Sequence, residues 1–318
     1  PDPSVETVMK GAKAMEEFQP DWIVAVGGGS PIDAAKAMWA FYEYPETSFE
    51  DLITPFSFPT LRTKAKFCAI SSTSGTATEV TAFSVITDYA KGIKYPLADF
   101  NITPDVAIVD PALAATMPKK LTAHTGMDAM THAIEAYVST LHCEYTDPLA
   151  LHAIEMINEY LVPSYNGDMD ARAKMHDAQC LAGMAFSNAG LGIIHAMAHA
   201  LGGRFGLPHG LCNAILLPYG MEFNGTDKIT SREFKKIAAA LALPGADSMT
   251  GFQASTASAA YLREFSALLG LPQRLRDMEV NPEIFDELAE TAMEDSCMDD
   301  NPFKPTKEQV GDVYRRAY

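Results

Sequence analysis

The sequence has few basic residues, no paired-cysteine motif and no long apolar run. Its 24 Lys and Arg are outnumbered by 41 Asp and Glu, which gives a formal net charge of -17. Such a chain lacks the basic surface that holds nucleic acid or an anionic membrane, so neither partner is expected. No apolar run approaches the roughly 18 residues that span a bilayer, and no leader-like segment opens the chain. These absences predict a soluble, cytoplasmic protein.

The cysteines do not form a recognisable framework. They are odd in number and scattered, at Cys68, Cys143, Cys180, Cys212 and Cys297. No C-x-x-C spacing occurs, so neither a disulfide scaffold nor a zinc knuckle is indicated. We expect five reduced thiols.

Hydrophobic periodicity divides the chain into two parts. Helical and strand-like segments alternate at first, over 5–18, 21–26, 30–42, 66–71 and 105–109. Long helical-period stretches then follow, over 121–140, 148–160, 170–201, 231–240 and 255–269. Alternation predicts βαβ units and a parallel sheet. We therefore predict an α/β dinucleotide-binding domain over residues 1–112, followed by an all-helical domain over residues 113–318 that shares a cleft with it.

The opening of the chain is unusual for such a fold. A dinucleotide-binding fold normally starts on a strand, whereas this sequence starts just ahead of a helix. We expect that the first strands of the parallel sheet are missing from the sequence, the alternative being a short form of the fold.

A glycine-rich turn follows the first predicted strand. The segment Gly27-Gly28-Gly29-Ser30-Pro31 would let the backbone approach a ligand, with Ser30 as N-cap and Pro31 at the first helical position. Asp33 falls in the first helical turn. A helix N-terminus of this kind attracts phosphate. A plain glycine turn is the alternative, since G-x-G-x-x-G is not present.

A second loop, over residues 71–79, concentrates Ser and Thr hydroxyl groups beside Gly75. It also follows an apolar strand. Two loops at the carboxyl ends of neighbouring strands are typical of nucleotide binding in a doubly wound sheet.

The helical part carries pairs of potential metal ligands. Asp128 and His132 are four residues apart, as are His195 and His199, and His209 follows in a loop bounded by Gly and Pro. A four-residue spacing puts both side chains on one helix face. Any one of these histidines is more commonly a hydrogen-bonded core residue, but burying the whole set is costly without a cation.

Chemistry thus selects Asp128, His132, His195 and His209 as metal ligands. One carboxylate and three imidazoles suit Fe(II) or Zn(II), and the sequence does not choose between them. Glu135 is either a hydrogen-bond partner of a ligating histidine or an exposed carboxylate.

Several ordered segments resemble the iron-containing (group III) alcohol dehydrogenase family. They are GGGSPIDAAK at 27–36, STSGTATEVT at 72–81, IKYPLADFNITPDVAIVDP at 93–111, TGMDAMTHAIEAYVS at 125–139, HAMAHALG at 195–202, PHG at 208–210 and DSCMDDNP at 295–302. Within that family the sequence is most similar to NAD(P)-dependent butanol dehydrogenases and to the alcohol dehydrogenase half of bifunctional aldehyde-alcohol dehydrogenases.

The resemblance implies a dehydroquinate synthase-like architecture and the same four metal ligands. It implies that the cofactor lies along Gly28, Gly29, Ser30, Asp33, Ser72, Thr73, Thr76, Thr81, Phe83 and Lys94. His199 would face the nicotinamide and take part in proton transfer, while Phe186 and Cys297 would line the alcohol pocket. The position that separates NAD from NADP falls in the missing opening part, so either cofactor remains open.

From this resemblance we expect a cytoplasmic fermentation enzyme, a homodimer or larger assembly. It would move a hydride reversibly between NAD(P) and a short-chain primary alcohol or aldehyde of the butanol or ethanol type. The metal, with Fe(II) favoured and Zn(II) possible, would act as a Lewis acid on the substrate oxygen. The alternatives are a polyol dehydrogenase of the glycerol type and a non-catalytic nucleotide-binding assembly subunit.

Overall fold

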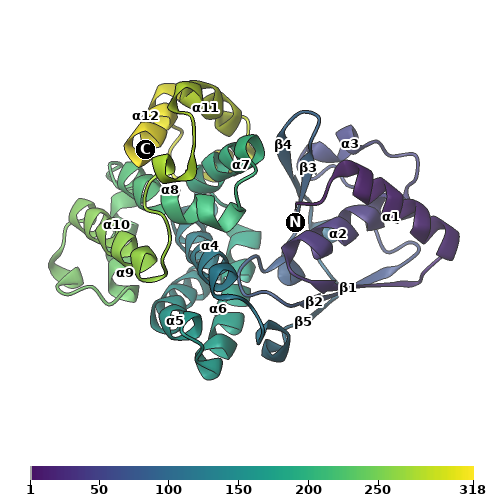
Figure 1. The fold of residues 1–318 in the computed structure, drawn as a ribbon, viewed down its shortest axis with the longest axis horizontal. Coiled ribbons are helices and arrows are strands. Elements are labelled where there is room, and N and C mark those ends of the chain that lie inside the picture. The colour runs from purple at the N-terminus through teal and green to yellow at the C-terminus, as the bar shows by residue number, and fades with distance from the viewer. Residues whose placement is uncertain (1) are drawn as a thin grey trace.

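The computed structural model describes residues 2–318, which form an α/β part and a helical part (Figure 1). In the α/β part, three strands pair in parallel in the order β1-β2-β5. The strands are β1 (Trp22–Gly27), β2 (Lys66–Ser71) and β5 (Val106–Ile108). The helices are α1 (Val5–Phe18), α2 (Gly29–Glu43) and α3 (Phe49–Ile53). The predicted fold class, a parallel α/β unit followed by a helical unit, is confirmed.

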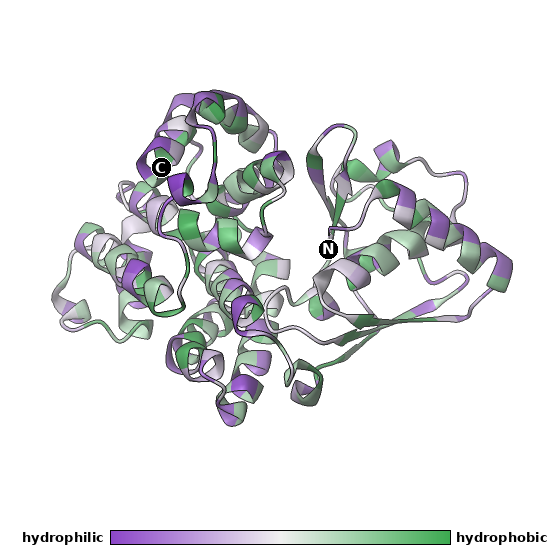
Figure 2. Cartoon of the chain, viewed as in Figure 1, coloured by the Kyte–Doolittle hydropathy of each residue, from purple (hydrophilic) through white to green (hydrophobic). Residues whose placement is uncertain are grey.

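The strands of this sheet are largely hydrophobic (Figure 2). In β1, Ile23 and Ala25 are buried in the core that α1 and α2 share with the sheet. Val24 and Val26 alternate with them and are 58% and 56% exposed. The period of two therefore assigns one face of β1 to the helices and leaves the other face in contact with solvent.

An antiparallel hairpin stands at the boundary of the two parts, and the sequence analysis did not predict it. It consists of β3 (Phe83–Asp88) and β4 (Ile93–Ala98), with Phe83 opposite Ala98 and Thr87 opposite Lys94. The hairpin packs on α2, and β4 contacts α7 of the helical part (Figure 1). Phe83 and Lys94 thereby face the region between the two parts.

The helical part is built around one buried helix. Every residue of α4 (Lys119–Val138) from Gly126 onwards is buried, and α5, α6 and α8 pack against it. The other helices are α5 (Asp147–Tyr165), α6 (Met169–Ala189), α7 (Ile193–Phe205), α8 (His209–Asn224), α9 (Thr230–Ala240), α10 (Gly251–Leu268), α11 (Phe285–Met293) and α12 (Lys307–Ala317). Polar side chains on α4 must find partners inside the protein.

The stretch predicted as one helix over residues 170–201 is two helices, so that prediction was wrong. The chain turns by 103° between α6 and α7. Gly190 at the turn has φ of +74°, and a Cβ there would lie 2.1 Å from Asp300 Oδ2. Hydrophobic period does not register such a break, because the residues on both sides are equally apolar.

Within residues 2–318, no single helix has the length and apolar content needed to cross a membrane. Only α6 and α7 taken together meet that test, and they are the pair bent at Gly190. Both helices contribute to the hydrophobic core of the helical part.

Candidate metal centre and active site

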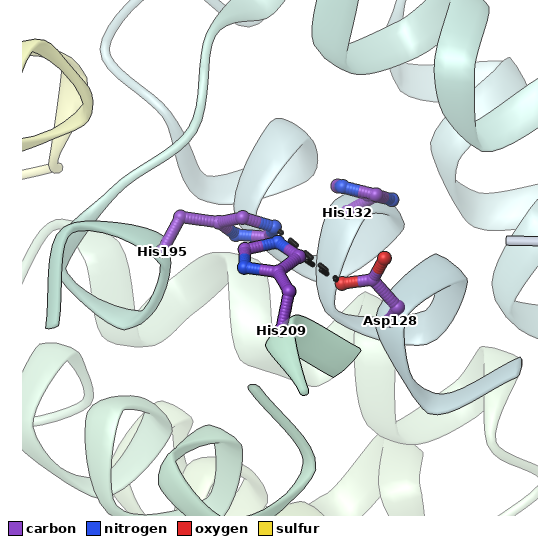
Figure 3. A group of neighbouring side chains, drawn as sticks. All are labelled: Asp128, His132, His195 and His209. Carbon is purple, nitrogen blue, oxygen red and sulfur yellow. Dashed lines mark ion pairs between the residues drawn. The ribbon is translucent and has the colours of Figure 1, made fainter. Parts of the chain in front are cut away.

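Four side chains from three helices converge in the helical part (Figure 3). Asp128 and His132 come from α4, His195 from α7 and His209 from α8. One potential ligand atom from each lies within 4.8 Å of all the others. Asp128 Oδ1 is 3.8 Å from His195 Nε2 and 3.5 Å from His209 Nε2. The structure thus brings together the four residues that were predicted as ligands.

A close contact between two helices positions His209. Gly210 follows it at the start of α8, and a Cβ on Gly210 would lie 2.3 Å from the carbonyl oxygen of His124 in α4. Only a residue without a side chain permits that approach. His209 itself is the first residue of α8, so its predicted place in a loop was wrong.

Burial keeps the imidazoles neutral. It lowers the pKa of His209 to about 3, and it lowers the pKa values of His132 and His195 below their ordinary range. A neutral ring retains a lone pair, which a metal requires of a histidine ligand. Within residues 2–318, His132 Nδ1 has no hydrogen-bond partner. This donor set, one carboxylate and three neutral imidazoles, fits a divalent cation of the Fe(II) or Zn(II) kind.

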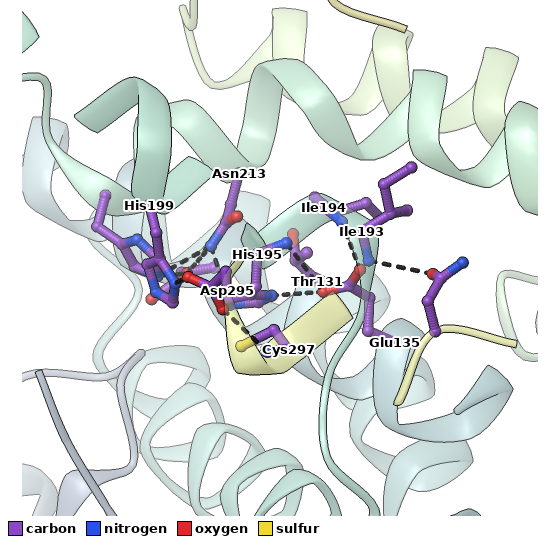
Figure 4. Close-up of polar contacts among 12 residues, drawn as sticks. Thr131, Glu135, Ile193, Ile194, His195, His199, Asn213, Asp295 and Cys297 are labelled. Atoms are coloured by element: carbon purple, nitrogen blue, oxygen red, sulfur yellow. Dashed lines mark hydrogen bonds and ion pairs between the residues drawn. The ribbon is translucent and has the colours of Figure 1, made fainter. Parts of the chain in front are cut away.

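Glu135 orients one of these rings (Figure 4). Its Oε2 lies 2.5 Å from His195 Nδ1, and its Oε1 accepts a 2.7 Å hydrogen bond from the backbone N–H of Ile194. Burial raises the pKa of Glu135 to about 8, and in its ionised form this carboxylate accepts the Nδ1–H of His195. The Nε2 lone pair of His195 is then directed at the cluster. Of the two interpretations of Glu135, the structure shows the hydrogen-bond partner.

Glu135 also helps to determine where α7 starts. The first N–H groups of a helix have no partners within it. Asn301 Oδ1 accepts from the N–H of Ile193 at 3.1 Å, and Glu135 accepts from the next two N–H groups. Side chains from elsewhere in the chain therefore cap α7 and fix the position of His195.

The sequence analysis missed Asn213, which lies at the centre of the cluster. Its fully buried Nδ2 is 2.7 Å from Asp128 Oδ1, 3.0 Å from His195 Nε2 and 3.1 Å from His209 Nε2. It follows His209 by four residues on α8. The same spacing that identified the other pairs would have identified it, had His209 been assigned to a helix.

His199 lies beside the cluster rather than in it. Its ring stacks on His209 at 5.0 Å between centroids, and its Nδ1 is 2.8 Å from Asp295 Oδ2. Burial alone would raise the pKa of Asp295, but His199 and the hydrogen bonds from Cys297 hold it below its ordinary value. An ionised Asp295 accepts Nδ1–H and leaves His199 Nε2 with its lone pair.

Most of the predicted site residues line one cavity between the α/β and helical parts. Its lining residues are Asp2, Pro3, Gly29, Ser30, Asp33, Thr76, Thr78, Thr81, Phe83, Val85, Lys94, Pro96, Asp128, His132, Phe186, Leu191, His195, His199, His209 and Cys297. Three predicted cofactor residues, Gly28, Ser72 and Thr73, do not line it. Thr78 and Leu191 do, although they were not singled out in the sequence.

The glycine turn and the hydroxyl-rich loop touch each other at the cavity. A Cβ on Gly28 would lie 2.9 Å from Thr73 Cγ2, and one on Gly29 would lie 2.9 Å from Thr76 Cγ2. Helix α2 starts at Gly29 with Gly28 as its N-cap, so the prediction that Ser30 is the cap was wrong. With no side-chain cap, the first N–H groups of α2 remain available to an anion.

Two predicted residues at the cavity already have protein partners. Asp33 Oδ2 accepts from the backbone N–H of Val85 at 3.1 Å, and burial raises the pKa of Asp33 to about 6. Lys94 Nζ is 2.8 Å from Asp2 Oδ1. Asp33 therefore joins α2 to β3, while the Lys94 ammonium group lies at the cavity wall.

Aromatic and thiol groups form the wall nearest the metal cluster. Phe186 stacks on His132 with ring centroids 4.3 Å apart, and Phe83 lies 5.8 Å from Phe186. Cys297 is buried on the same cavity. This wall offers an apolar surface next to the potential ligand atoms.

Comparison with known proteins places this site in a family. Residues 1–111 match the iron-containing alcohol dehydrogenase family, and residues 122–318 match the C-terminal part of the Fe-containing alcohol dehydrogenase family. The chain is 57% identical to an NADPH-dependent butanol dehydrogenase of Clostridium saccharobutylicum, covering 100% of this chain and 82% of that protein. It is also 45% identical to an aldehyde-alcohol dehydrogenase of Streptococcus pneumoniae. That match covers 100% of this chain and 38% of the other protein.

Solved structures show the same fold. The structure of a 1,3-propanediol oxidoreductase aligns with a TM-score of 0.93 and 34% identity, covering 100% of this chain and 82% of that one.

Proposed function

Because this chain belongs to the iron-containing alcohol dehydrogenase family, and is thus a metal-dependent oxidoreductase of alcohols that uses NAD or NADP, we propose that it interconverts short-chain primary alcohols and aldehydes. The observation that carries the proposal is the largely buried cluster of the Asp128 carboxyl group and three neutral histidines at the wall of a cavity beside an uncapped helix N-terminus. Identity of 57% to a butanol dehydrogenase supports a simple alcohol over the glycerol-type alternative.

We assign the metal to Asp128, His132, His195 and His209. Glu135 supports the assignment because it leaves His195 Nε2 unprotonated toward the cluster. When bound, the cation supplies Lewis-acid stabilisation of charge on the substrate oxygen, and the nicotinamide exchanges a hydride with the carbinol carbon.

The cofactor residues follow from the cavity. The N–H groups at Gly29 and Ser30 meet the pyrophosphate at the start of α2. Thr76, Thr81, Phe83 and Lys94 lie along the remaining wall. Gly28 and Thr73 support this wall without lining the cavity, because the absence of a Cβ on Gly28 lets the two loops meet. Ser72, which does not line the cavity, belongs with this supporting layer.

His199 accepts the proton of the alcohol hydroxyl. Asp295 holds Nδ1–H, so Nε2 is the atom that receives it, and in aldehyde reduction the same atom returns it. Oxidation of one alcohol then yields one aldehyde, one reduced cofactor and one proton. Phe186 and Cys297 bound the alkyl end of the substrate, where the wall is apolar.

The proposal extends to location and assembly: a cytoplasmic enzyme that forms a homodimer or a larger oligomer. The formal net charge of -17 favours the solubility of such an enzyme. Size-exclusion chromatography with light scattering measures the subunit number directly.

The decisive experiment is aldehyde-dependent oxidation of NADH and NADPH by metal-stripped protein reloaded anaerobically with Fe(II) or Zn(II). We expect metal-dependent turnover of butanal and ethanal, and slower oxidation of glycerol and 1,3-propanediol than of butanol in the reverse direction. Preference for the polyols would select the glycerol-type alternative. Cofactor and metal binding without turnover of any of these substrates would select the non-catalytic assembly role.

A further inference from the structure

A second group of ligand-type side chains lies beside the metal cluster. It consists of His199 on α7, and of Asp295 and Cys297 at the 3-10 helix Ser296–Asp300. One potential ligand atom from each lies within 4.8 Å of the others. All three side chains are nearly inaccessible to solvent. We call this group the sulfur-containing cluster; it shares no residue with the four proposed ligands of the first metal.

The three groups are already held in place. Asp295 Oδ1 accepts a 2.9 Å hydrogen bond from the backbone N–H of Cys297, and Oδ2 lies 2.8 Å from His199 Nδ1 (Figure 4). The carboxylate therefore joins the His199 imidazole to the backbone of Cys297. Such a pre-arranged set loses little conformational freedom when an ion binds.

The donor atoms differ in kind from those of the first cluster. One thiol, one imidazole and one carboxylate form a ligand set typical of zinc, and thiolate shifts preference toward soft and borderline ions. The first cluster contains no sulfur. The two clusters should therefore differ in the metals they retain.

An ion can reach the sulfur-containing cluster from a separate side. His199 and Asp295 also line a second cavity, between β4 and α11, whose other charged residues are Lys94, Glu294 and Asp299. Lys94 is paired with Asp2, so the carboxylates of Glu294, Asp295 and Asp299 leave the cavity with a net attraction for a cation. Water in that cavity can supply the fourth ligand of a tetrahedral ion.

We propose that His199 Nδ1, Asp295 and the Cys297 thiolate form a second, inhibitory binding site for a thiophilic divalent cation such as Zn(II). Binding breaks the Cys297 S–H bond and forms an S–metal bond, and the thiol proton leaves to solvent. The His199 Nδ1–H bond also breaks, so that Nδ1 can bind the metal while its proton moves to Nε2. No oxidation or reduction accompanies the step. Burial raises the pKa of the free Cys297 thiol well above its ordinary value, so the metal itself must stabilise the thiolate.

Charge balance allows both sites to fill. The Cys297 thiolate and the Asp295 carboxylate together offset the two positive charges of the second ion, which limits its repulsion of the first. The inhibitory consequence rests on the proposed function, because the ion would occupy the imidazole that accepts the substrate proton. The binding site itself does not depend on that role.

X-ray absorption at the zinc edge tests the site without any measurement of activity. Wild-type protein is saturated with Zn(II), dialysed and analysed for metal content and for zinc–sulfur scattering at about 2.3 Å. We expect a second equivalent of zinc and a sulfur signal, because the first cluster provides only nitrogen and oxygen. Cys297→Ser should lose the sulfur signal and bind the second equivalent at least roughly 10- to 100-fold more weakly.

Cys143→Ser is the matched control, since Cys143 is the partly exposed thiol that would bind zinc adventitiously; it should retain the signal and the second equivalent. Asp295→Asn serves as an independent variant that should also weaken the second site. Zinc–sulfur scattering that is absent from the wild type, or that persists in Cys297→Ser, would overturn the proposal. Absence of turnover in protein that holds only the first metal equivalent, with the sulfur signal present at saturation, would instead contradict the proposed function alone.

Discussion

Replacing Glu135 by Gln removes the carboxyl group that accepts the Nδ1–H of His195 when ionised, while keeping the shape of the side chain. In the wild type, Glu135 accepts from Ile194 N–H at 2.7 Å and from His195 Nδ1–H at 2.5 Å. A glutamine amide cannot accept a hydrogen bond at both contacts. If its oxygen faces His195 Nδ1–H, its NH2 group faces the N–H of Ile194 and both donors are left unpaired.

The reverse orientation of the amide is no better. Its NH2 group then donates to His195 Nδ1, and the ring carries its proton on Nε2, the atom that faces the metal cluster. That tautomer cannot ligate a metal until the proton moves. Loss of a hydrogen-bond partner behind a ligating histidine typically weakens metal binding about 10- to 100-fold, or about 1.4–2.8 kcal/mol.

The assay is competition for Zn(II) or Fe(II) with a chromophoric chelator at neutral pH, under anaerobic conditions for iron. Glu159→Gln, on the exposed face of α5, is the matched control and should bind metal as the wild type does. Thermal unfolding with and without metal separates weakened binding from misfolding, because the metal-dependent part of the stability should shrink only in Glu135→Gln. Equal metal affinity in the two variants would refute the assigned role of Glu135.

His195→Ala removes one proposed ligand and should abolish metal retention and turnover, whereas His199→Ala should keep the metal and slow turnover. Metal analysis and initial rates of the two variants test this. Wild-type activity in His195→Ala would contradict the ligand set. Gly210→Ala places a methyl group 2.3 Å from the His124 carbonyl oxygen, so the free energy of unfolding in urea should fall by about 1–3 kcal/mol, with loss of metal. Glu43→Gln removes a charged acceptor of four backbone N–H groups and should cost about 1.5–3 kcal/mol at pH 7. Although burial raises the pKa of Glu43, these hydrogen bonds hold it below the ordinary 4.5, so the stabilisation is lost as the pH falls below that value and the two proteins should converge in acid.

Helices and strands such as α1 and β2 could be predicted from the sequence because their hydrophobic period depends on residues close together in the chain. The predicted segments over 5–18 and 66–71 coincide with α1 and β2. The break near Gly190 and the β3–β4 hairpin could not be predicted from the sequence. Both depend on contacts with distant residues, such as Asp300 beside Gly190, that periodicity does not record.

The same distinction applies to the site. A four-residue spacing on a helix fixes which face a side chain leaves, so the sequence by itself paired Asp128 with His132 and His195 with His199. His209 was added as a third histidine in a loop bounded by Gly and Pro, which completed the predicted ligand set. It could not decide that Glu135 is buried against His195, that Asn213 contacts three of the potential ligand atoms, or that Asp295 holds His199. Apart from the contact of Asn213 with His209, four positions away, those relations join residues from 18 to 96 positions apart. Only the packing of α8 against α4, and of α7 against α8 and the 3-10 helix Ser296–Asp300, brings them within hydrogen-bonding distance.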